Sequence, residues 1–465
     1  MSIEAMVGSA DFFNKSLHGQ VNAATAKRSP GSTLKPFVYA LAMDEGLIHP
    51  RSLLKDSPRR FGGFTPENYD RRFLGPVSAK EALIESRNVP AVYLQSQLKE
   101  TSFYDFLQQA NVTGLKDESH YGLALALGGG EVTMLELASL YATAANQGVM
   151  KPINFNAEPI DTVTQKKRLL SKESSFLMLD MLKDNPMPGS LDFSSGDITK
   201  NQVAWKTGTS WAFRDAWAVG VSGPYVLVVW VGNFNGKGND SFVGRTAAGP
   251  LMFSLFNSVT EKQGWQVEDS VSVANLNLKQ VEVCRKTGDL YEEHCGSAVS
   301  TWFIPGVSPI KVSNVYRSIP INIESGLRAC FNQPGKTEMK VYEFWSSDFL
   351  HIFNQAGISL ASPPRYESGC DIADKSNHGQ VPIITSPQET VEYVVRMEVT
   401  KERQIPLKAI VDPDVIKVHW FVDHAYVGSS NNGKPLLWDS RPGSFQVLAV
   451  DDSGRSSYKN IRVTQ

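Results

Sequence analysis

The sequence has almost no net charge and no long uninterrupted apolar run. Its formal net charge is −2 over 465 residues, whereas a dedicated nucleic-acid binder normally carries a basic excess or a basic patch. The most apolar stretch, residues 216–234, is broken by Gly, Ser and Pro in its middle. We therefore expect two strands and a turn in this stretch, and no transmembrane helix.

Cysteine is scarce and confined to the second half of the chain, at Cys284, Cys295, Cys330 and Cys370. None of the spacings is the Cys-x-x-Cys of zinc or redox sites. We predict two disulfides, with Cys284–Cys295 closing a small loop and Cys330–Cys370 closing a larger one. Free thiols are the alternative. Two disulfides would indicate an exported protein, because cysteine usage follows the redox compartment.

A signal peptide is also missing. The chain opens with "MSIEAMVGSADFF", a strand-like pattern without a basic or apolar leader. Predicted disulfides and a missing leader conflict unless something upstream is absent. We therefore expect this chain to be the C-terminal part of a longer, exported protein.

The length of the chain predicts two or three domains. Residues 1–260 mix helices and strands, with helices expected at 77–86, 89–98 and 132–148 and strands from 202 to 234. This texture predicts an α/β domain with a mixed antiparallel sheet and flanking helices. Two further regions follow it. Residues 261–375 form a cysteine-containing region of short strands, and residues 376–465 read as an all-β, immunoglobulin-like sandwich.

Ser-x-x-Lys, a pattern that can pair a nucleophile with a base, occurs five times in this chain. The serines are Ser32, Ser52, Ser96, Ser308 and Ser456. Ser32 and Lys35 share a helix face, and the ring of Pro36 would clash with the carbonyl of Ser32 if a helix ran upstream through it. Ser32 should therefore lie at the mouth of a helix, where free N–H groups favour negative charge. We interpret the other four matches as chance.

Two further patterns accompany Ser32. Ser86-Arg87-Asn88 lies between two expected helices, where Ser86 could relay a proton and Asn88 could orient Lys35 and a carbonyl group. A plain helix cap and turn is the alternative for this tripeptide. The second pattern begins at Lys206. Its positive charge could keep Lys35 neutral, and a lysine must be neutral to act as a base.

Lys206-Thr207-Gly208-Thr209-Ser210 lies on an expected edge strand. Gly208 would let a peptide backbone approach the strand closely, and Lys206, Thr207 and Thr209 would bind a terminal carboxylate. The N–H groups of Ser32 and Thr209 could form an oxyanion hole. Ser210 completes the predicted substrate-binding set. A second Lys-Thr-Gly, at Lys286, is followed by Asp and is interpreted as a turn.

The order of these three patterns is the known signature of penicillin-binding proteins and class A β-lactamases. The chain closely resembles the transpeptidase domain of bifunctional class A penicillin-binding proteins through four stretches and, in its β-rich end, the C-terminal domain of the 1C type. The stretches are "GQVNAATAKRSPGSTLKPFVYALAMDEGLIHP", "ESRNVPAVYL", "LALGGGEVTMLELASLYATAANQG" and "KTGTSWAFRDAWAVGVSG".

The resemblance implies a serine D,D-transpeptidase of the bacterial periplasm that cross-links peptidoglycan stem peptides. Ser32 would be the nucleophile, Lys35 the base, Ser86 the relay and Asn88 a positioning group, while Lys206, Thr207 and Thr209 would hold the carboxylate. β-Lactams would acylate Ser32. No metal or cofactor is implied. Other cell-wall proteins are candidate partners of the last domain.

The resemblance also leaves some expectations open. Family members carry a membrane anchor and a glycosyltransferase domain, and this chain has neither, so glycan polymerisation cannot be assigned to it. A D,D-carboxypeptidase, a β-lactamase and a scaffolding module with little turnover are the alternatives to a transpeptidase.

Overall fold

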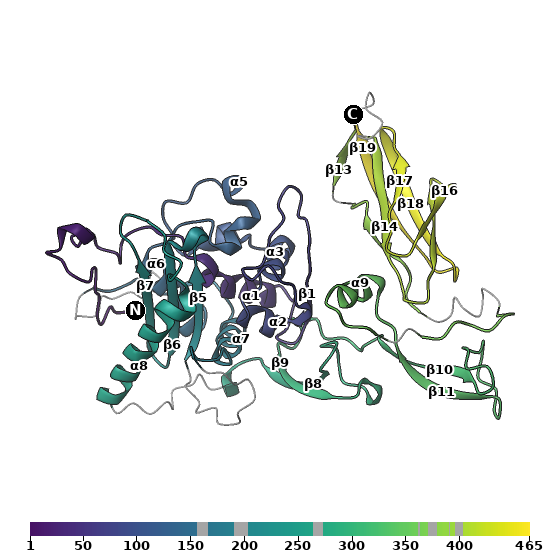
Figure 1. Cartoon of the computed structure of the whole chain (residues 1–465), viewed down its shortest axis with the longest axis horizontal. Helices are drawn as coiled ribbons and strands as arrows, with labels where there is room; N and C mark the ends of the chain where they lie inside the picture. Colours follow the sequence, from purple (N-terminus) through teal and green to yellow (C-terminus); the bar gives the residue numbers. More distant parts are fainter. Residues whose placement is uncertain are drawn as a thin grey trace. The chain divides into compact units, whose positions relative to one another are not determined.

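The structure, a computed structural model, describes all but seven short parts of the chain. It covers residues 1–155, 166–189, 203–263, 273–360, 363–370, 379–389, 391–395 and 403–465. The chain forms two compact units, coloured along the sequence in Figure 1. The first unit comprises residues 1–73, 77–290 and 298–311, and the second comprises residues 74–76, 291–297 and 312–465.

The helices and strands of the chain up to residue 311 are mostly short. The helices are α1 (Lys35–Asp44), α2 (Ala79–Ile84), α3 (Asn88–Gln97), α4 (Phe103–Gln109), α5 (Glu118–Tyr121), α6 (Met134–Ala145), α7 (Lys172–Lys183) and α8 (Gly249–Gln263). The strands are β1 (Leu53–Asp56), β2 (Gly75–Ser78), β3 (Val149–Met150), β4 (Lys167–Arg168), β5 (Ala204–Thr209), β6 (Asp215–Ser222), β7 (Tyr225–Gly232), β8 (Lys279–Cys284) and β9 (Ala298–Phe303).

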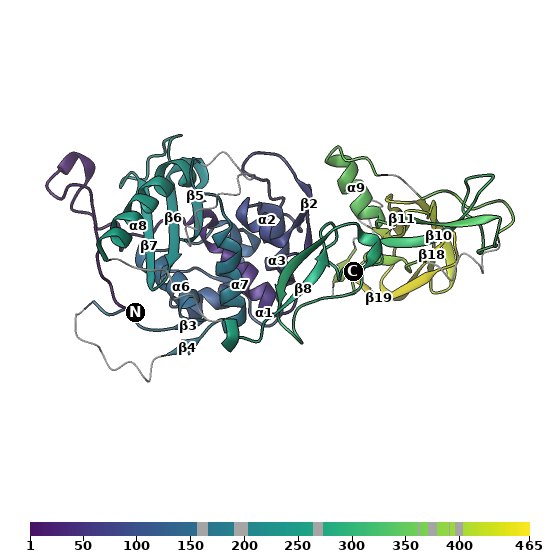
Figure 2. The same ribbon diagram turned by 90° about the horizontal axis from the view of Figure 1, so that it is seen from below.

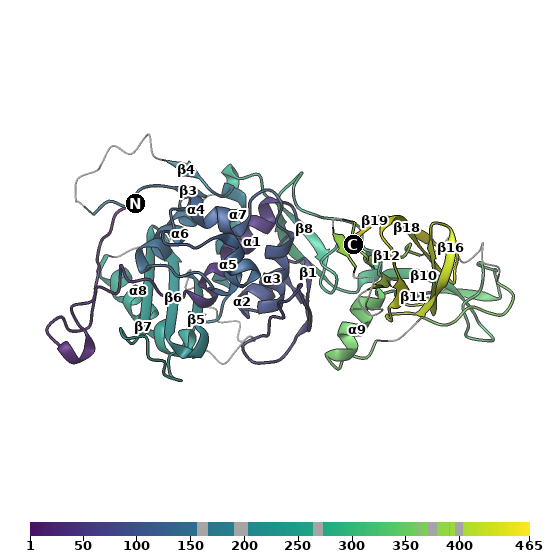
Figure 3. The same cartoon turned by 90° about the horizontal axis from the view of Figure 1, so that it is seen from above.

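The first unit is built around the antiparallel sheet β5-β6-β7, as Figure 1, Figure 2 and Figure 3 show. Side chains alternate between the two faces of a strand. Trp205 and Ala218 pack with Phe256 of α8 on one face. Ala204 and Trp217 join the large core formed with α1, α6 and α7 on the other face. In this described sheet β5 is an edge strand, as predicted.

The helices expected at 77–86, 89–98 and 132–148 are confirmed as α2, α3 and α6. Local sequence signals explain their positions. In α6 the N–H of Glu136 donates to the Thr133 hydroxyl, and the Glu136 carboxylate accepts from the N–H of Thr133. This capping box satisfies two of the backbone donors that a helix start leaves open.

The strand-like start of the chain does not form a strand. Residues 1–14 contain only an isolated bridge between Ser2 and Asn154. Val7 and Phe13 are 77% and 86% exposed, so the alternating pattern buries neither side chain. The prediction was wrong because alternation becomes a strand only beside a partner strand, and the described structure places none beside this segment.

The second unit is β-rich. Its elements are β10 (Tyr316–Asn322), β11 (Thr337–Glu343), α9 (Ser347–Gln355), β12 (Ile383–Ser386), β13 (Glu392–Val394), β14 (Gln404–Ile410), β15 (Lys417–Val422), β16 (Ala425–Asn431), β17 (Leu436–Asp439), β18 (Gly443–Asp451) and β19 (Ser456–Thr464). The described strands form the hairpin β10-β11 and two sheets, β12-β14-β17 and β13-β19-β18-β15-β16. Leu407, Trp420 and Val447 of these two sheets are fully buried in one shared core. The β-rich C-terminal region is confirmed, whereas its immunoglobulin-like topology stays a prediction.

The cysteine predictions are confirmed for one pair and wrong for the other. Cys330 and Cys370 form a disulfide that joins positions 40 residues apart. Cys284 and Cys295 are both buried as thiols and are not joined to each other. The Sγ of Cys295 instead lies 3.5 Å from the carbonyl oxygen of Ser297 in its own tight turn. The spacing of Cys284 and Cys295 in the sequence does not show which way the Cys295 side chain points.

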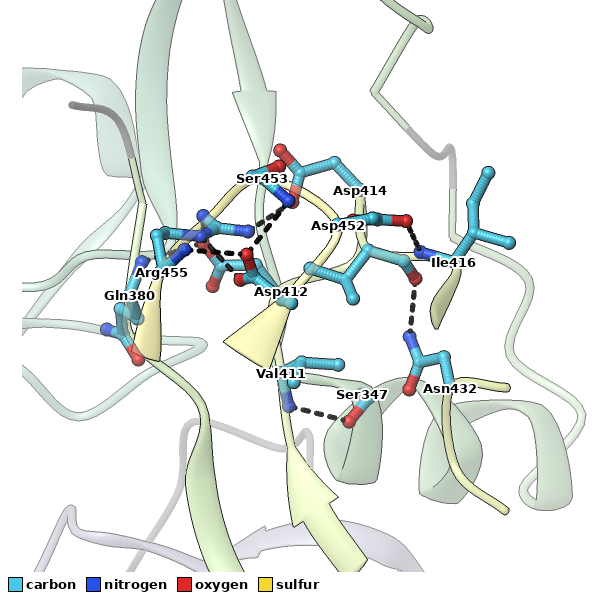
Figure 4. Close-up of polar contacts among 12 residues, drawn as sticks. Ser347, Gln380, Val411, Asp412, Asp414, Ile416, Asn432, Asp452, Ser453 and Arg455 are labelled. Atoms are coloured by element: carbon cyan, nitrogen blue, oxygen red, sulfur yellow. Dashed lines mark hydrogen bonds and ion pairs between the residues drawn. The ribbon is translucent and has the colours of Figure 1, made fainter. Parts of the chain in front are cut away.

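Arg455 is the centre of a buried ionic cluster in the second unit (Figure 4). Its guanidinium donates to Asp451 at 2.7 Å and to Asp412 at 3.0 Å, and it lies 3.4 Å from Asp414. The side chain of Arg455 is 2% exposed. A Cβ at Gly379 would lie 1.7 Å from Nη1 of Arg455, so glycine is required there. The cluster ties the loop after β14 to the turn between β18 and β19.

We predict that Arg455→Ala destabilises the protein by about 3–5 kcal/mol, because it removes the cation that pairs with the buried Asp451 carboxylate and one of the two arginines that pair with Asp412. The matched control is Arg462→Ala. Arg462 also pairs with a carboxylate, but its side chain is 75% exposed, so its loss should change stability by less than about 1 kcal/mol. Chemical denaturation followed by fluorescence checks both values. Equal effects of the two substitutions would contradict the assignment.

Candidate active site

Ser32 lies where the sequence predicts it, directly before the first turn of a buried helix. Residues Gly31–Leu34 form a 3-10 turn, and α1 starts at Lys35. The N–H of Lys35 donates to the carbonyl of Ser32. Gly31 has a φ of +53°, and a Cβ there would lie 2.6 Å from the carbonyl oxygen of Thr209. The turn that carries Ser32 therefore packs directly against β5.

Lys35 is fully buried and bonded to the second motif. Its Nζ donates to the carbonyl oxygen of Ser86 at 2.5 Å and to Oδ1 of Asn88 at 2.5 Å. The Oγ of Ser86 lies 3.5 Å from the same nitrogen. The two short bonds use the two hydrogens that a neutral amine has, which leaves its lone pair for another proton donor.

Lys206, from the third motif, reaches the same serine. Its side chain is also fully buried, and its Nζ donates to Oγ of Ser86 at 2.8 Å and to the carbonyl of Thr207 at 3.1 Å. Three motifs that are far apart in the sequence thus meet at one hydroxyl group. Among the five Ser-x-x-Lys matches, only the lysine that follows Ser32 shares a serine with Lys206 in the described structure.

Both lysines have lowered pKa values. Burial is the largest cause of the low pKa of Lys35, followed by the charges of Lys206 and Arg87, and its pKa lies well below the ordinary value. Burial, with a smaller contribution from the charge of Arg245, lowers the pKa of Lys206 to about 7. Two cations cannot easily coexist in this buried site, so a neutral lysine is favoured near neutral pH.

The backbone around Ser86 is held by interactions that the sequence reasoning missed. Ser86 has a φ of +57°, which is unfavourable for a residue other than glycine. Next to it, the guanidinium of Arg87 forms a buried ion pair with Asp56 at 2.7 Å. Asn88 donates its N–H to Asn68 at 2.7 Å and its Nδ2 to the carbonyl of Glu67. Asp56, Glu67 and Asn68 lack a recognisable motif, because their role depends on contacts across 20 to 31 residues.

Gly208, on the predicted substrate-binding strand β5, makes room for a group other than the predicted peptide. A Cβ at Gly208 would lie 2.1 Å from the carbonyl oxygen of Pro30. The close approach is therefore made by the turn that carries Ser32. Thr207 and Thr209 are half-buried on the edge strand, and the hydroxyl of Thr209 accepts the N–H of Gly244 at 3.0 Å.

Ser210 is buried and bonded within the fold. Its hydroxyl donates to Oδ2 of Asp215 at 2.8 Å and accepts the N–H of Asp215 at 2.9 Å. This arrangement fixes the loop that follows β5. Substrate binding by Ser210 stays a prediction. Ser210 also lines a cavity of about 410 Å³, together with residues that include Arg28, Trp211 and Arg214.

The family follows from a profile match over more than half of the chain. Residues 2–248 match the penicillin binding protein transpeptidase domain. The chain belongs to the penicillin-binding protein family. Residues 275–318 also match the penicillin-binding protein 1A C-terminal domain, and residues 373–463 match the penicillin-binding protein C-terminus family. Membership confirms the family resemblance of the sequence.

Curated relatives agree with this family. Penicillin-binding protein 1C of Escherichia coli K12 is 34% identical over 98% of the chain, which spans 59% of that relative. Penicillin-binding protein 1F of Bacillus subtilis is 37% identical over 50% of the chain and 33% of the relative. The crystal structure of penicillin-binding protein 1A from Haemophilus influenzae shares the fold, with a TM-score of 0.52 at 23% identity over 63% of this chain and 51% of that one. Within the described residues, no helix is both long and apolar enough to cross a membrane.

The contact between Gly208 and Pro30 generates a prediction. Gly208→Ala should destabilise the protein by about 1–3 kcal/mol, because backbone atoms must move to admit the new methyl group. Gly63→Ala is the matched control, since a Cβ at Gly63 meets nothing within 4 Å. Thermal unfolding of both variants measures the difference. A Gly208→Ala variant as stable as Gly63→Ala would contradict the close packing of the Ser32 turn on β5.

Proposed function

We propose that this chain is a serine D,D-transpeptidase that cross-links peptidoglycan stem peptides through an acyl-enzyme on Ser32. The observation that carries the proposal is the meeting of two fully buried lysines at the hydroxyl of Ser86. Family membership supports an acyl-serine transferase. The D-Ala–D-Ala substrate and the roles of individual residues belong to the proposal.

In the proposed first half-reaction, neutral Lys35 takes the proton of the Ser32 hydroxyl. The Ser32 oxygen attacks the carbonyl carbon of the penultimate D-Ala, and the N–H groups of Ser32 and Thr209 bind the oxyanion. The proton passes from Lys35 through Ser86 to the leaving amine. The bond to the terminal D-Ala breaks, and the ester on Ser32 remains.

In the second half-reaction, the amine of a neighbouring stem peptide attacks the ester. The same groups work in reverse, so that the amine proton returns through Ser86 and Lys35 to the oxygen of Ser32. The carboxylate held by Lys206, Thr207 and Thr209 has already left with the terminal D-Ala of the donor in the first half-reaction. Water as acceptor would give D,D-carboxypeptidase activity instead.

The setting of the reaction is part of the same proposal. We infer that the chain works in the bacterial periplasm, that the full protein is anchored in the inner membrane, and that β-lactams inhibit it by acylating Ser32. The Cys330–Cys370 disulfide supports an oxidising compartment. We further propose that the two C-terminal sheets form an immunoglobulin-like sandwich that offers a surface to other cell-wall proteins.

Product formation tests the proposed reaction. With a stem-pentapeptide donor and an amine acceptor, the wild-type protein should release D-Ala and form a cross-linked product, and Ser32→Ala should lower both by about a thousandfold or more. The control Ser96→Ala removes the hydroxyl of another Ser-x-x-Lys and should keep wild-type activity. D-Ala release without cross-linking would indicate a carboxypeptidase, and sustained penicillin hydrolysis would indicate a β-lactamase. Penicillin binding without any product would indicate a scaffolding module.

The pH dependence tests Lys35 as the base. Raising the pH neutralises the lysine, so the rate constant for acylation by benzylpenicillin should rise with pH along an acidic limb. Lys206→Gln removes a cation that lowers the pKa of Lys35. The limb should therefore move to higher pH in this variant, whatever the loss in absolute rate. Lys237→Gln, which removes an exposed cation on the loop after β7, is the control. A limb that stays in place or moves to lower pH in Lys206→Gln contradicts the assignment.

A further inference from the structure

Two aromatic rings from distant parts of the sequence meet beside the candidate active site. The rings of Tyr69 and Phe213 contact each other edge to face, with centroids 6.1 Å apart and planes at 79°. Tyr69 is 69% exposed, so its ring is not buried in a core. Phe213 is half-buried, so core packing does not account for the exposed ring of Tyr69 beside it.

The ring of Tyr69 projects from a firmly held backbone. Its neighbour Asn68 donates from Nδ2 to Asp56 at 2.8 Å and accepts the N–H of Asn88 at 2.7 Å. Its other neighbour, Asp70, pairs with Arg87 at 3.0 Å. Tyr69 is therefore fixed, on both sides, to the tripeptide that carries Ser86 and Asn88.

Phe213 comes from the opposite side of the site. It lies in the short segment between β5 and β6, four residues after Thr209. Ala212 and Phe213 have φ values of +59° and +53°, an unfavourable conformation for two consecutive residues other than glycine. The segment is kept in place because the N–H of Phe213 donates to the carbonyl of Ser210 and the carbonyl of Phe213 accepts the N–H of Asn239. Strain of this kind is typical of functional sites.

In the proposed function, a donor peptide beside β5 is bordered by Thr209, which the Ser32 turn contacts, and by Asn88, which accepts a hydrogen bond from Lys35. The contact between Phe213 and Tyr69 joins these two sides. A single edge-to-face contact between a half-buried ring and an exposed one is weak, so the exposed ring of Tyr69 can move aside when a substrate enters and pack against it afterwards. The rings would then border the substituent next to the bond that Ser32 attacks.

We propose that Tyr69 and Phe213 form an aromatic clasp beside the candidate active site that limits the size of the substituent on the acyl side of the reacting bond. The clasp rests on the proposed function, because it acts on the acyl donor of Ser32. Tyr69 and Phe213 are specificity-determining residues in this account, and they take no part in proton transfer.

Two penicillins of different size test the clasp. For each variant, stopped-flow or gel-based kinetics gives the second-order rate constant for acylation by benzylpenicillin and by piperacillin, which has a much larger side chain. Tyr69→Ala and Phe213→Ala should each raise the piperacillin-to-benzylpenicillin ratio by about tenfold, because either substitution opens the clasp. The double variant should raise the ratio no further than a single one, since the two rings act as one unit.

Two controls separate the clasp from nonspecific effects. Tyr69→Phe keeps the ring and should keep the wild-type ratio, and Tyr458→Ala removes a similarly exposed tyrosine, 61% accessible, on β19. Thermal unfolding checks that all variants are folded. Unchanged ratios in Tyr69→Ala and Phe213→Ala, or equal effects of Tyr69→Phe and Tyr69→Ala, would overturn the clasp while the acyltransferase proposal stands. Failure of both penicillins to acylate the wild-type protein would overturn the proposed function and the clasp with it.

Discussion

The first unit depends on the burial of two lysines beside one serine. Lys35 and Lys206 are both fully buried, and their amines lie 3.5 Å and 2.8 Å from Oγ of Ser86. Burying two like charges this close is strongly unfavourable unless at least one is neutral. The lowered pKa values of both lysines express that constraint. A lysine that acts as a base must also be neutral and lie next to a serine hydroxyl. The burial that disfavours the charged form of Lys35 is therefore also what allows its amine to accept a proton.

The surrounding structure holds this arrangement in place. The buried Arg87–Asp56 pair fixes the unfavourable backbone of Ser86, and the close contacts at Gly31 and Gly208 press the Ser32 turn onto β5. Glycine at these two positions leaves room for backbone atoms of the other segment. The helices and the sheet thus hold three separate motifs at one point, while the β-rich second unit has its own core and its own buried ionic cluster.

Sequence reasoning correctly predicted the features that local sequence patterns determine. Capping signals placed α6, Pro36 placed Ser32 before a helix, and Val- and Trp-rich runs broken by Gly, Ser and Pro placed β5 to β7. It failed for features that depend on contacts between residues far apart in the sequence. The opening segment alternates like a strand but, among the described residues, has no partner strand beyond one isolated bridge. Cys295 points to its own turn, and Gly208 makes room for the carbonyl group of Pro30. Asp56, at the end of β1, pairs with Arg87, and Glu67 and Asn68, in the loop after β1, bond to Asn88; none of them belongs to a motif, so no pattern in the sequence identifies them.

The central claim is that Ser32 is the nucleophile. The most direct measurement is mass spectrometry of the protein after reaction with benzylpenicillin, first intact and then as proteolytic peptides. The account predicts one added penicillin per chain, located on Ser32 in the peptide that contains the turn before α1. An adduct on another residue, or an unmodified chain under conditions in which the protein is folded, would contradict it.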